Sequence, residues 1–405
     1  MVIKEGYKQT EIGIIPNDWM IEKMSELTIL MTNGFVGIAK THYTPYDNGV
    51  LYIQGYNVKE NSFNFNGIKR VTEEFHAKNS KSNLREGDLL TVQTGDVGQT
   101  TIVPKELEGS NCHALIISRF KKHKYNSLYF SYYLNSDIGR VRLKGIETGT
   151  TMKHINVGDL IHFYVPIPII AEQTAIATAL SDTDGLITGL EKLIAKKRNI
   201  KQGAMQQLLQ PKEGWVVKKL GELISEIADG GTPPTSNNNY FGGEIYWVVI
   251  DDIKEEIFTT KQTLTREGLL NSSARLWQPE TIILSTGATI GEVGIAKIPL
   301  ATKQGICGIV VKADVSNLFL KYWLIKNKKL ILSLAQGSSI KEVRPPTLVK
   351  FEIIIPKTKE EQTRIATILS DMDAELSALE QKLEKYKKVK LGMMQELLTG
   401  KTRLV

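Results

Sequence analysis

The sequence lacks the features of a membrane, secreted or metal-binding protein. No apolar run in its 405 residues approaches the ~20 residues that span a bilayer. Its first residues contain no apolar signal core. The two cysteines, Cys112 and Cys307, are expected to be free thiols in a reducing cytoplasm. The six histidines show no metal-ligand spacing, so we expect no metal site.

Motifs of common catalytic sites are missing too. There is no G-x-x-x-x-G-K-[ST] loop and no G-x-G-x-x-G after a predicted strand. The Asn/Asp-Pro-Pro-aromatic tetrapeptide of amino-methyltransferases is also absent. The segment 251–254 (DDIK) has a faint likeness to a nuclease motif, but a solvated turn explains it better. The sequence therefore predicts a chain without catalytic activity.

Charge alone does not identify a partner. The 51 basic and 44 acidic residues give a formal net charge of +7. Such a diffuse excess is compatible with nucleic-acid binding, but many other soluble proteins have it. This excess falls mainly outside the repeated segments described next, so any DNA contact should come mainly from residues outside them.

A long internal repeat organises the chain. The segment 172–209 recurs without a gap at 361–398, and both copies open with EQ-x2-IA-x2-LSD-x-D. The segments before each copy share sparse anchors, such as Thr94-Gly95 and Thr286-Gly287, and otherwise differ almost completely. This order predicts a first variable domain (1–170), a first conserved helix (171–210), a second variable domain (211–359) and a second conserved helix (360–405).

Both copies of the repeat have a heptad period, which is typical of a coiled coil. Lysines interrupt the seam at Lys197, Lys201 and Lys390. We expect the two helices to bury their seams on each other, with close approach at the small residues Gly185 and Gly189. The alternative is that each helix packs on its own domain. The predicted interface residues are Ile176, Leu180, Ile187, Leu190, Ile194, Leu208, Ile365, Leu369, Met372, Leu376, Leu379, Leu383 and Leu397.

Each variable domain alternates short β-rich runs with Gly and Asn turns and one helical stretch. The clearest runs are 88–93, 114–120, 281–284 and 306–312, and the helices are 128–135 and 318–326. The predicted fold is therefore mixed α/β: two similar globular domains separated by two long antiparallel helices, related by an internal pseudo-two-fold duplication.

The repeated EQ-x2-IA-x2-LSD-x-D opening, the heptad helix and its M-x-x-LL end resemble the conserved repeats of type I restriction–modification specificity subunits. The proline-rich entries VPIPII and IIIPK and the start of the second variable domain, Gly231-Thr232-Pro233, are similar to that family too. The second entry lacks the first proline and has one extra residue. The resemblance covers the whole chain in order.

The resemblance implies a non-catalytic bacterial or archaeal subunit that reads a bipartite, asymmetric site in double-stranded DNA, one half-site per variable domain. It implies that two methyltransferase (modification) subunits dock on the helices, and that ATP-dependent restriction subunits can join them. S-adenosylmethionine, ATP and Mg²⁺ are expected in those partners, with no cofactor in this chain. Two alternatives remain: a scaffold whose domains bind proteins, and a free-standing enzyme, which the missing motifs disfavour.

Candidate DNA-contacting residues follow from polar loops and paired glycine loops. Side chains with donors or acceptors can read base edges, and lysines can hold phosphates. Lys153 and Lys341 end matched Gly-Thr/Ser-rich loops. The full predicted set is His42, Tyr43, Thr94, Gln99, Lys153, Thr235, Ser236, Asn237, Thr286, Thr289 and Lys341.

Overall fold

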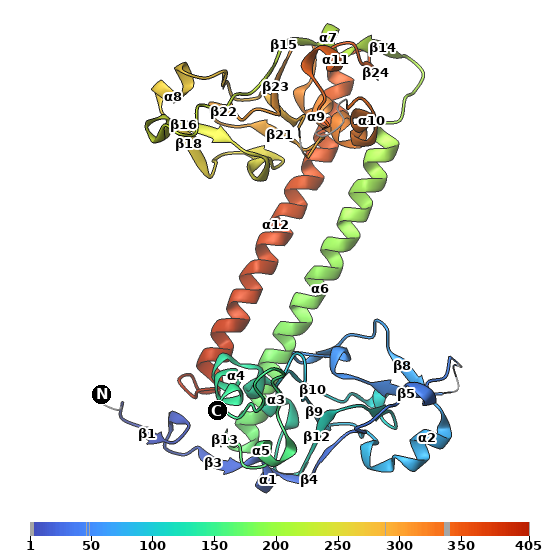
Figure 1. Ribbon diagram of the computed structural model, residues 1–405, viewed down its shortest axis with the longest axis vertical. Helices are drawn as coiled ribbons and strands as arrows, with labels where there is room; N and C mark the ends of the chain where they lie inside the picture. The colour runs from blue at the N-terminus through green and yellow to red at the C-terminus, as the bar shows by residue number, and fades with distance from the viewer. Residues whose placement is uncertain (1–3, 46, 48, 288, 336–340, 405) are drawn as a thin grey trace. The chain divides into compact units, whose positions relative to one another are not determined.

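The computed structural model describes residues 4–45, 47, 49–287, 289–335 and 341–404. Its contacts divide the chain into a first unit, Met1–Glu191 with Lys382–Val405, and a second unit, Lys192–Gln381. Two long helices, α6 (Ile170–Leu208) and α12 (Lys359–Leu397), each contribute residues to both units (Figure 1). In the described ranges, no helix is long and apolar enough to cross a membrane.

The first unit is built on an antiparallel four-stranded sheet, in the order β10-β9-β12-β4, with a three-stranded sheet, β11-β5-β8. Helix α3 lies against β9 and β10, so β9 is buried along its whole length (Figure 1). The elements are β1 Tyr7–Thr10, β2 Gly13–Pro16, β3 Met20–Lys23, α1 Met24–Leu27, β4 Thr28–Asn33, β5 Val50–Ile53, β6 Val58–Lys59, β7 Ser62–Phe63, β8 Lys69–Val71, α2 Glu73–Lys78, β9 Leu89–Val92, β10 Thr100–Ile102, β11 Asn111–Cys112, β12 Leu115–Phe120, α3 Ser127–Asn135, α4 Asp137–Lys144, α5 Val157–Leu160 and β13 Tyr164–Ile167.

The second unit repeats this plan with a five-stranded sheet, β15-β23-β20-β21-β17, and a four-stranded sheet, β18-β16-β22-β19. Its elements are β14 Trp215–Lys219, α7 Leu220–Leu223, β15 Ile224–Asp229, β16 Phe241–Val248, β17 Glu256–Ile257, β18 Gln262–Leu264, α8 Arg266–Leu270, β19 Leu276–Trp277, β20 Ile282–Ser285, β21 Val293–Ala296, β22 Leu300–Thr302, β23 Ile306–Val311, α9 Asn317–Lys326, α10 Lys328–Ser333, α11 Pro345–Leu348 and β24 Glu352–Pro356.

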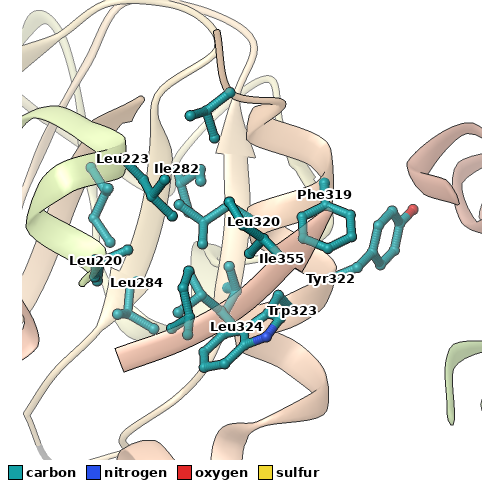
Figure 2. Close-up of a cluster of buried hydrophobic side chains, with 14 of the residues drawn as sticks. Leu220, Leu223, Ile282, Leu284, Phe319, Leu320, Tyr322, Trp323, Leu324 and Ile355 are labelled. Carbon is teal, nitrogen blue, oxygen red and sulfur yellow. The ribbon is translucent and has the colours of Figure 1, made fainter. Parts of the chain in front are cut away.

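The predicted strands and helices are confirmed within a residue or two: the four β runs are β9, β12, β20 and β23, and the two helices are α3 and α9. Helix α9 carries apolar side chains on several of its faces. Many of these side chains are buried in the second unit's core, against the sheet. Figure 2 shows Phe319, Leu320 and Trp323 among residues of β20 and α7, and Tyr322 with its hydroxyl pointing away from them. Both domains are therefore mixed α/β, as the sequence predicts.

The repeated glutamine of the EQ motif fastens each long helix to its own domain. Gln173 Oε1 accepts from the backbone N–H of Asn126 (2.9 Å), just before α3. Gln362 Oε1 accepts from the N–H of Ser316 (2.9 Å), just before α9. Each amide Nε2 also donates to the carbonyl of a proline that precedes its helix. The motif is thus a connection between helix and domain.

The repeated glutamate of the motif accepts a hydrogen bond from a tryptophan of the same unit. Trp19 Nε1 lies 2.9 Å from Glu172 Oε2, and Trp215 Nε1 lies 3.2 Å from Glu361 Oε1. At the first position Arg403 adds to this contact: its Nε lies 2.5 Å from Glu172 Oε1, and its Nη1 lies 2.9 Å from Asp18 Oδ1. The segment after α12 therefore closes on the start of α6 through a charged contact.

The lysines that interrupt the seam have partners. In the first unit, Asp184 accepts from Tyr132 Oη (2.8 Å) and pairs with Lys390 Nζ (2.6 Å). In the second unit, Asp373 accepts from Tyr322 Oη (2.6 Å) and pairs with Lys201, which also pairs with Glu255. Burial, reinforced by the bonded aspartates, raises the pKa of both tyrosines. Each of these two clusters, which we call the Tyr-Asp-Lys triads, joins α3 or α9 to both long helices.

The expectation that the whole seam is buried between the two helices needs correction at its ends. Ile176, Leu180 and Leu397 belong to the first unit's globular core, and Ile365 and Leu369 to the second's, where Leu208 and Met372 also pack. The alternative of packing on the helix's own domain therefore holds for Ile176, Leu180, Ile365, Leu369 and Met372, whereas Leu208 and Leu397 pack on the core of the domain to which the other helix is fastened. The middle residues, Ile187, Leu190, Ile194, Leu376, Leu379 and Leu383, lie outside these cores and are buried or half-buried.

In each unit the two helix segments run antiparallel. In the first unit Thr183 contacts Met393, and Glu191 pairs with Lys387 (3.2 Å). In the second unit the pairs are Lys197–Glu375 (2.6 Å), Arg198–Glu380 (2.6 Å) and Lys201–Asp373. From Thr183–Met393 to Glu191–Lys387 in the first unit, and from Arg198–Glu380 to Lys201–Asp373 in the second, the paired positions ascend along α6 while they descend along α12, as antiparallel packing requires.

The expected close approach at Gly185 and Gly189 is wrong. A Cβ built on either glycine has no atom within 4 Å in the described structure. The counterparts Ala374 and Ala378 are exposed as well. Small size at these positions therefore does not serve packing between α6 and α12.

Replacing Leu376 with alanine should lower the free energy of unfolding by about 2 kcal/mol. This value is at the low end for buried leucines because its seam neighbours Leu379 and Leu383 are only half-buried. Urea unfolding monitored by helix ellipticity measures the loss. Leu193, which is 38% exposed on α6, is the control, and its alanine variant should stay within about 0.5 kcal/mol. Equal losses at both positions would contradict the helix packing.

Candidate nucleic-acid interface

Loops of the first unit gather where its strands end. The ends of β4 and β9 and the start of β12 share one edge, since Asn33 pairs with Ile116 and Val92 with Leu115. The second sheet ends there too, because the N–H of His113 donates to the carbonyl of Ile53 at the end of β5 (2.8 Å). We call the segments 33–43, 54–56, 93–99, 113–114 and 148–154 the first loop edge.

All five predicted residues of the first unit lie in these segments, and three of them, Tyr43, Thr94 and Lys153, lie close to one another. Thr94 is exposed and forms an antiparallel bridge with His154, which brings it beside the loop that carries exposed Lys153. Tyr43 is half-buried, and its hydroxyl accepts from Gln54 Nε2 (3.2 Å). A Cβ on Gly55 would lie 3.6 Å from the carbonyl oxygen of Thr94, so these loops are close neighbours.

His42 and Gln99 belong to the same segments but have other neighbours. The ring of exposed His42 lies 4.8 Å from that of Phe75, on α2. Gln99 is half-buried, and no described atom bonds to its Oε1. It lines a hollow of 330 Å³ with Asp96, Val97, Arg140, Leu143, Lys144 and Glu147.

The second unit has the same arrangement with other side chains. Ser285 at the end of β20 pairs with Ile306, and the N–H of Gly230 donates to the carbonyl of Ile306 (3.0 Å). The N–H of Lys303 donates to the carbonyl of Val248 at the end of β16 (3.0 Å). We call the segments 230–240, 249–252, 286–287, 289–291, 302–305 and 341–343 the second loop edge.

The predicted residues of the second unit are dispersed on this edge. Thr286 is 1% exposed, so its side chain does not face solvent, while its backbone bonds to Gly305 and Val343. Thr289 and Lys341 are exposed. The residues that precede Lys341 in the matched loop, 337–340, lie outside the described residues.

The polar loop with Thr235, Ser236 and Asn237 is a separate part of the second edge. Thr235 and Ser236 are exposed, and Asn237 Oδ1 accepts from the N–H of Asn239 (3.1 Å). Within the described ranges, no hydrogen bond joins this loop to Thr286 or Lys341.

Sequence reasoning missed several polar residues at the strand ends. Gln54 and His113 lie on the first loop edge, and exposed Lys303 and Gln304 on the second. His113 Nδ1 lies 3.0 Å from Tyr52 Oη, and burial lowers the pKa of this histidine. A polar residue directly after an apolar strand such as VLYI was the signal that could have found Gln54.

Each loop edge carries at least one exposed lysine among its polar side chains. No group of His, Cys, Asp and Glu able to hold a metal ion occurs in the part of the chain that the structure describes. Exposed Lys153, Lys303 and Lys341 supply cations suited to phosphates. What the two edges share is therefore a backbone plan that displays polar side chains, which differ between the units.

Comparison with known proteins bears on both halves of the chain. The family model described as type I restriction modification DNA specificity domain matches residues 16–202 and again 212–389. A putative type I restriction enzyme MjaX specificity subunit from Methanocaldococcus jannaschii is 27% identical over 427 residues, which cover 99% of this chain and 97% of that protein. The MjaIX specificity subunit of the same organism is 38% identical over 170 residues, 40% of this chain and 38% of that protein.

Solved structures show the same fold. The S subunit of a type I restriction–modification system from M. genitalium has 15% identity and a TM-score of 0.63, with 98% of each chain covered. The HsdS subunit from Thermoanaerobacter tengcongensis has 17% identity and a TM-score of 0.51, with 96% of this chain and 98% of that chain covered. With a specificity domain in each half, the chain belongs to the family of type I restriction–modification DNA specificity subunits.

Proposed function

We propose that this chain reads a bipartite, asymmetric site in double-stranded DNA, with one half-site bound by each loop edge. The observation that carries the proposal is the repetition of one strand-end plan with different side chains. Matched backbones present the two readers in the same way, while unlike side chains such as Gln54 and Val249 give them different base preferences. Identical readers would instead select a palindrome.

The proposal extends to partners. The exposed faces of the helix segments offer the docking surface for two methyltransferase subunits and, through them, for restriction subunits, while the Tyr-Asp-Lys triads hold the domains on the helices. The chain itself carries out no chemistry: S-adenosylmethionine, ATP and Mg²⁺ act in those partners. Because it reads cellular DNA, we place it in the cytoplasm of a bacterium or archaeon.

Exchanging residues 20–150 for the same region of a relative should change one half of the methylated site and leave the other intact. The exchanged segment contains the whole first loop edge except residues 151–154, whereas the second edge belongs to the other unit. The measurement is sequencing of methylated adenines in DNA from cells that express the chimera with its modification partner.

A reciprocal exchange in the second unit is the control, and it should change the opposite half-site. A chimera that altered both halves would contradict independent readers. An assembled wild-type complex that bound DNA without any sequence preference would favour the protein-binding scaffold instead.

A further inference from the structure

The amide of Gln54 is held in place before any DNA arrives. Its Nε2 donates to Tyr43 Oη (3.2 Å) and, at 3.5 Å, to Tyr56 Oη. Tyr56 in turn donates to the carbonyl of Gly67 (2.7 Å), so its lone pairs face the amide. The backbone N–H of Gln54 donates to Oδ1 of fully buried Asn57 (3.0 Å). The side-chain amide and the backbone N–H of Gln54 are therefore both held by hydrogen bonds.

The side chain remains open to a ligand. Gln54 is half-buried on the first loop edge, beside exposed Tyr56 and Thr94. A contact of 3.5 Å is at the outer limit of a hydrogen bond, so the N–H directed at Tyr56 is weakly held and available. A glutamine amide presents a donor next to an acceptor, which matches the N7 acceptor and N6 amino donor of adenine in the major groove.

The second unit has the same turn without the amide. The N–H of Val249 donates to Asp252 Oδ2 (3.0 Å), as that of Gln54 does to Asn57. A valine side chain has no hydrogen-bonding group. This turn therefore carries a hydrogen-bonding side chain, Gln54, on the first loop edge and an apolar one, Val249, on the second.

We propose that Gln54 reads one adenine of the half-site bound by the first loop edge. Oε1 accepts from the adenine N6 amino group and Nε2 donates to N7, while Tyr43 and Tyr56 orient the amide. This inference rests on the proposed function, and it names a base and the residue that selects it. Tyr43 and Tyr56 are positioning residues.

The test uses the full chain in complex with its modification subunits and sequencing of methylated adenines. In Gln54→Ala, one A·T position of one half-site should lose its selectivity by about ten- to a hundredfold, the usual value of a bidentate base contact. In Gln54→Glu, which can only accept, the same position should shift towards cytosine, whose N4 amino group donates. Such a shift cannot result from misfolding.

Gln9→Ala, at an exposed glutamine of β1 in the same unit, is the matched control and should keep the whole motif. Unchanged adenine selectivity in Gln54→Ala would overturn the inference, as would a change in both half-sites. Loss of all methylation in both Gln54 variants would also count against it, because a residue that only reads a base is not needed for assembly. A wild-type complex without a bipartite motif would overturn the proposed function, and this inference with it.

Discussion

Replacing Arg403 with alanine should lower the free energy of unfolding by about 3 kcal/mol, the usual cost of breaking one side of a buried ion pair. The side chain of Glu172 is fully buried, and Arg403 bonds to both of its oxygens as well as to both oxygens of Asp18. Without the guanidinium, the carboxylate keeps Trp19 Nε1 as a donor, which limits the loss. Urea unfolding at pH 7 measures it.

The same contact predicts a dependence on pH. The hydrogen bond from Arg403 lowers the pKa of Asp18, so this pair stabilises the fold above the ordinary carboxyl pKa of about 3.9. That stability is lost as the pH falls through the lowered pKa, and the acid sensitivity should be weaker in Arg403→Ala. The control is Arg364→Ala, at an exposed arginine of α12, with a change within about 0.5 kcal/mol. If both variants changed the free energy of unfolding equally, the contact of Arg403 with Glu172 and Asp18 would contribute nothing to stability.

Asp373→Ala should cost about 3 kcal/mol, and Asp184→Ala about 1 kcal/mol. Both remove the carboxylate of a Tyr-Asp-Lys triad, but the side chain of Asp373 is 9% exposed and that of Asp184 is 32% exposed. Without Asp373, the buried hydroxyl of Tyr322 loses its acceptor and the largely buried Lys201 keeps only Glu255 as a partner, whereas water reaches the more exposed site of Asp184 and can replace its contacts. Urea unfolding of each variant gives the two values.

The repeat provides matched controls for this prediction. Asp182 and Asp371 occupy the other aspartate position of the LSD-x-D motif and are exposed. Their alanine variants should change the free energy of unfolding by at most about 0.5 kcal/mol. If all four aspartate variants were equivalent, the triads would not be what anchors the domains to the helices.

The sequence predicted the long helices well because a heptad period over a 39-residue helix is a strong local signal. It did not predict what the ends of the seam contact. Ile176 and Ile365 have the same spacing as the central residues, and spacing does not say whether an apolar side chain meets a helix or a domain core. From the sequence, Lys201 and Lys390 were interpreted only as interruptions of the heptad seam. They occupy equivalent positions of the repeat, and so do their ion-pair partners Asp373 and Asp184.

The candidate interface was predicted less completely. The paired glycine loops drew attention to Thr94, which lies just after the end of β9, because turns between buried strands leave a clear sequence pattern. Thr286 shows the limit of the same reasoning, since it has the equivalent sequence position but a buried side chain. Gln54 has a local signal, as a polar residue directly after an apolar strand, but its place beside the other loops depends on the pairing of β5 with β11, which are distant in the sequence.

Cys112 and Cys307 are free thiols with no exposed surface, and burial raises the pKa of each far above its ordinary value. Thiolates are the reactive form of cysteine, so neither thiol reacts readily with maleimides or with methanethiosulfonate spin labels. The two native cysteines should therefore take up little label when another cysteine is introduced for site-directed labelling. One cysteine introduced at an exposed residue of each loop edge then allows spin labels to measure the distance between the two edges, with and without DNA, and the native cysteines need not be removed.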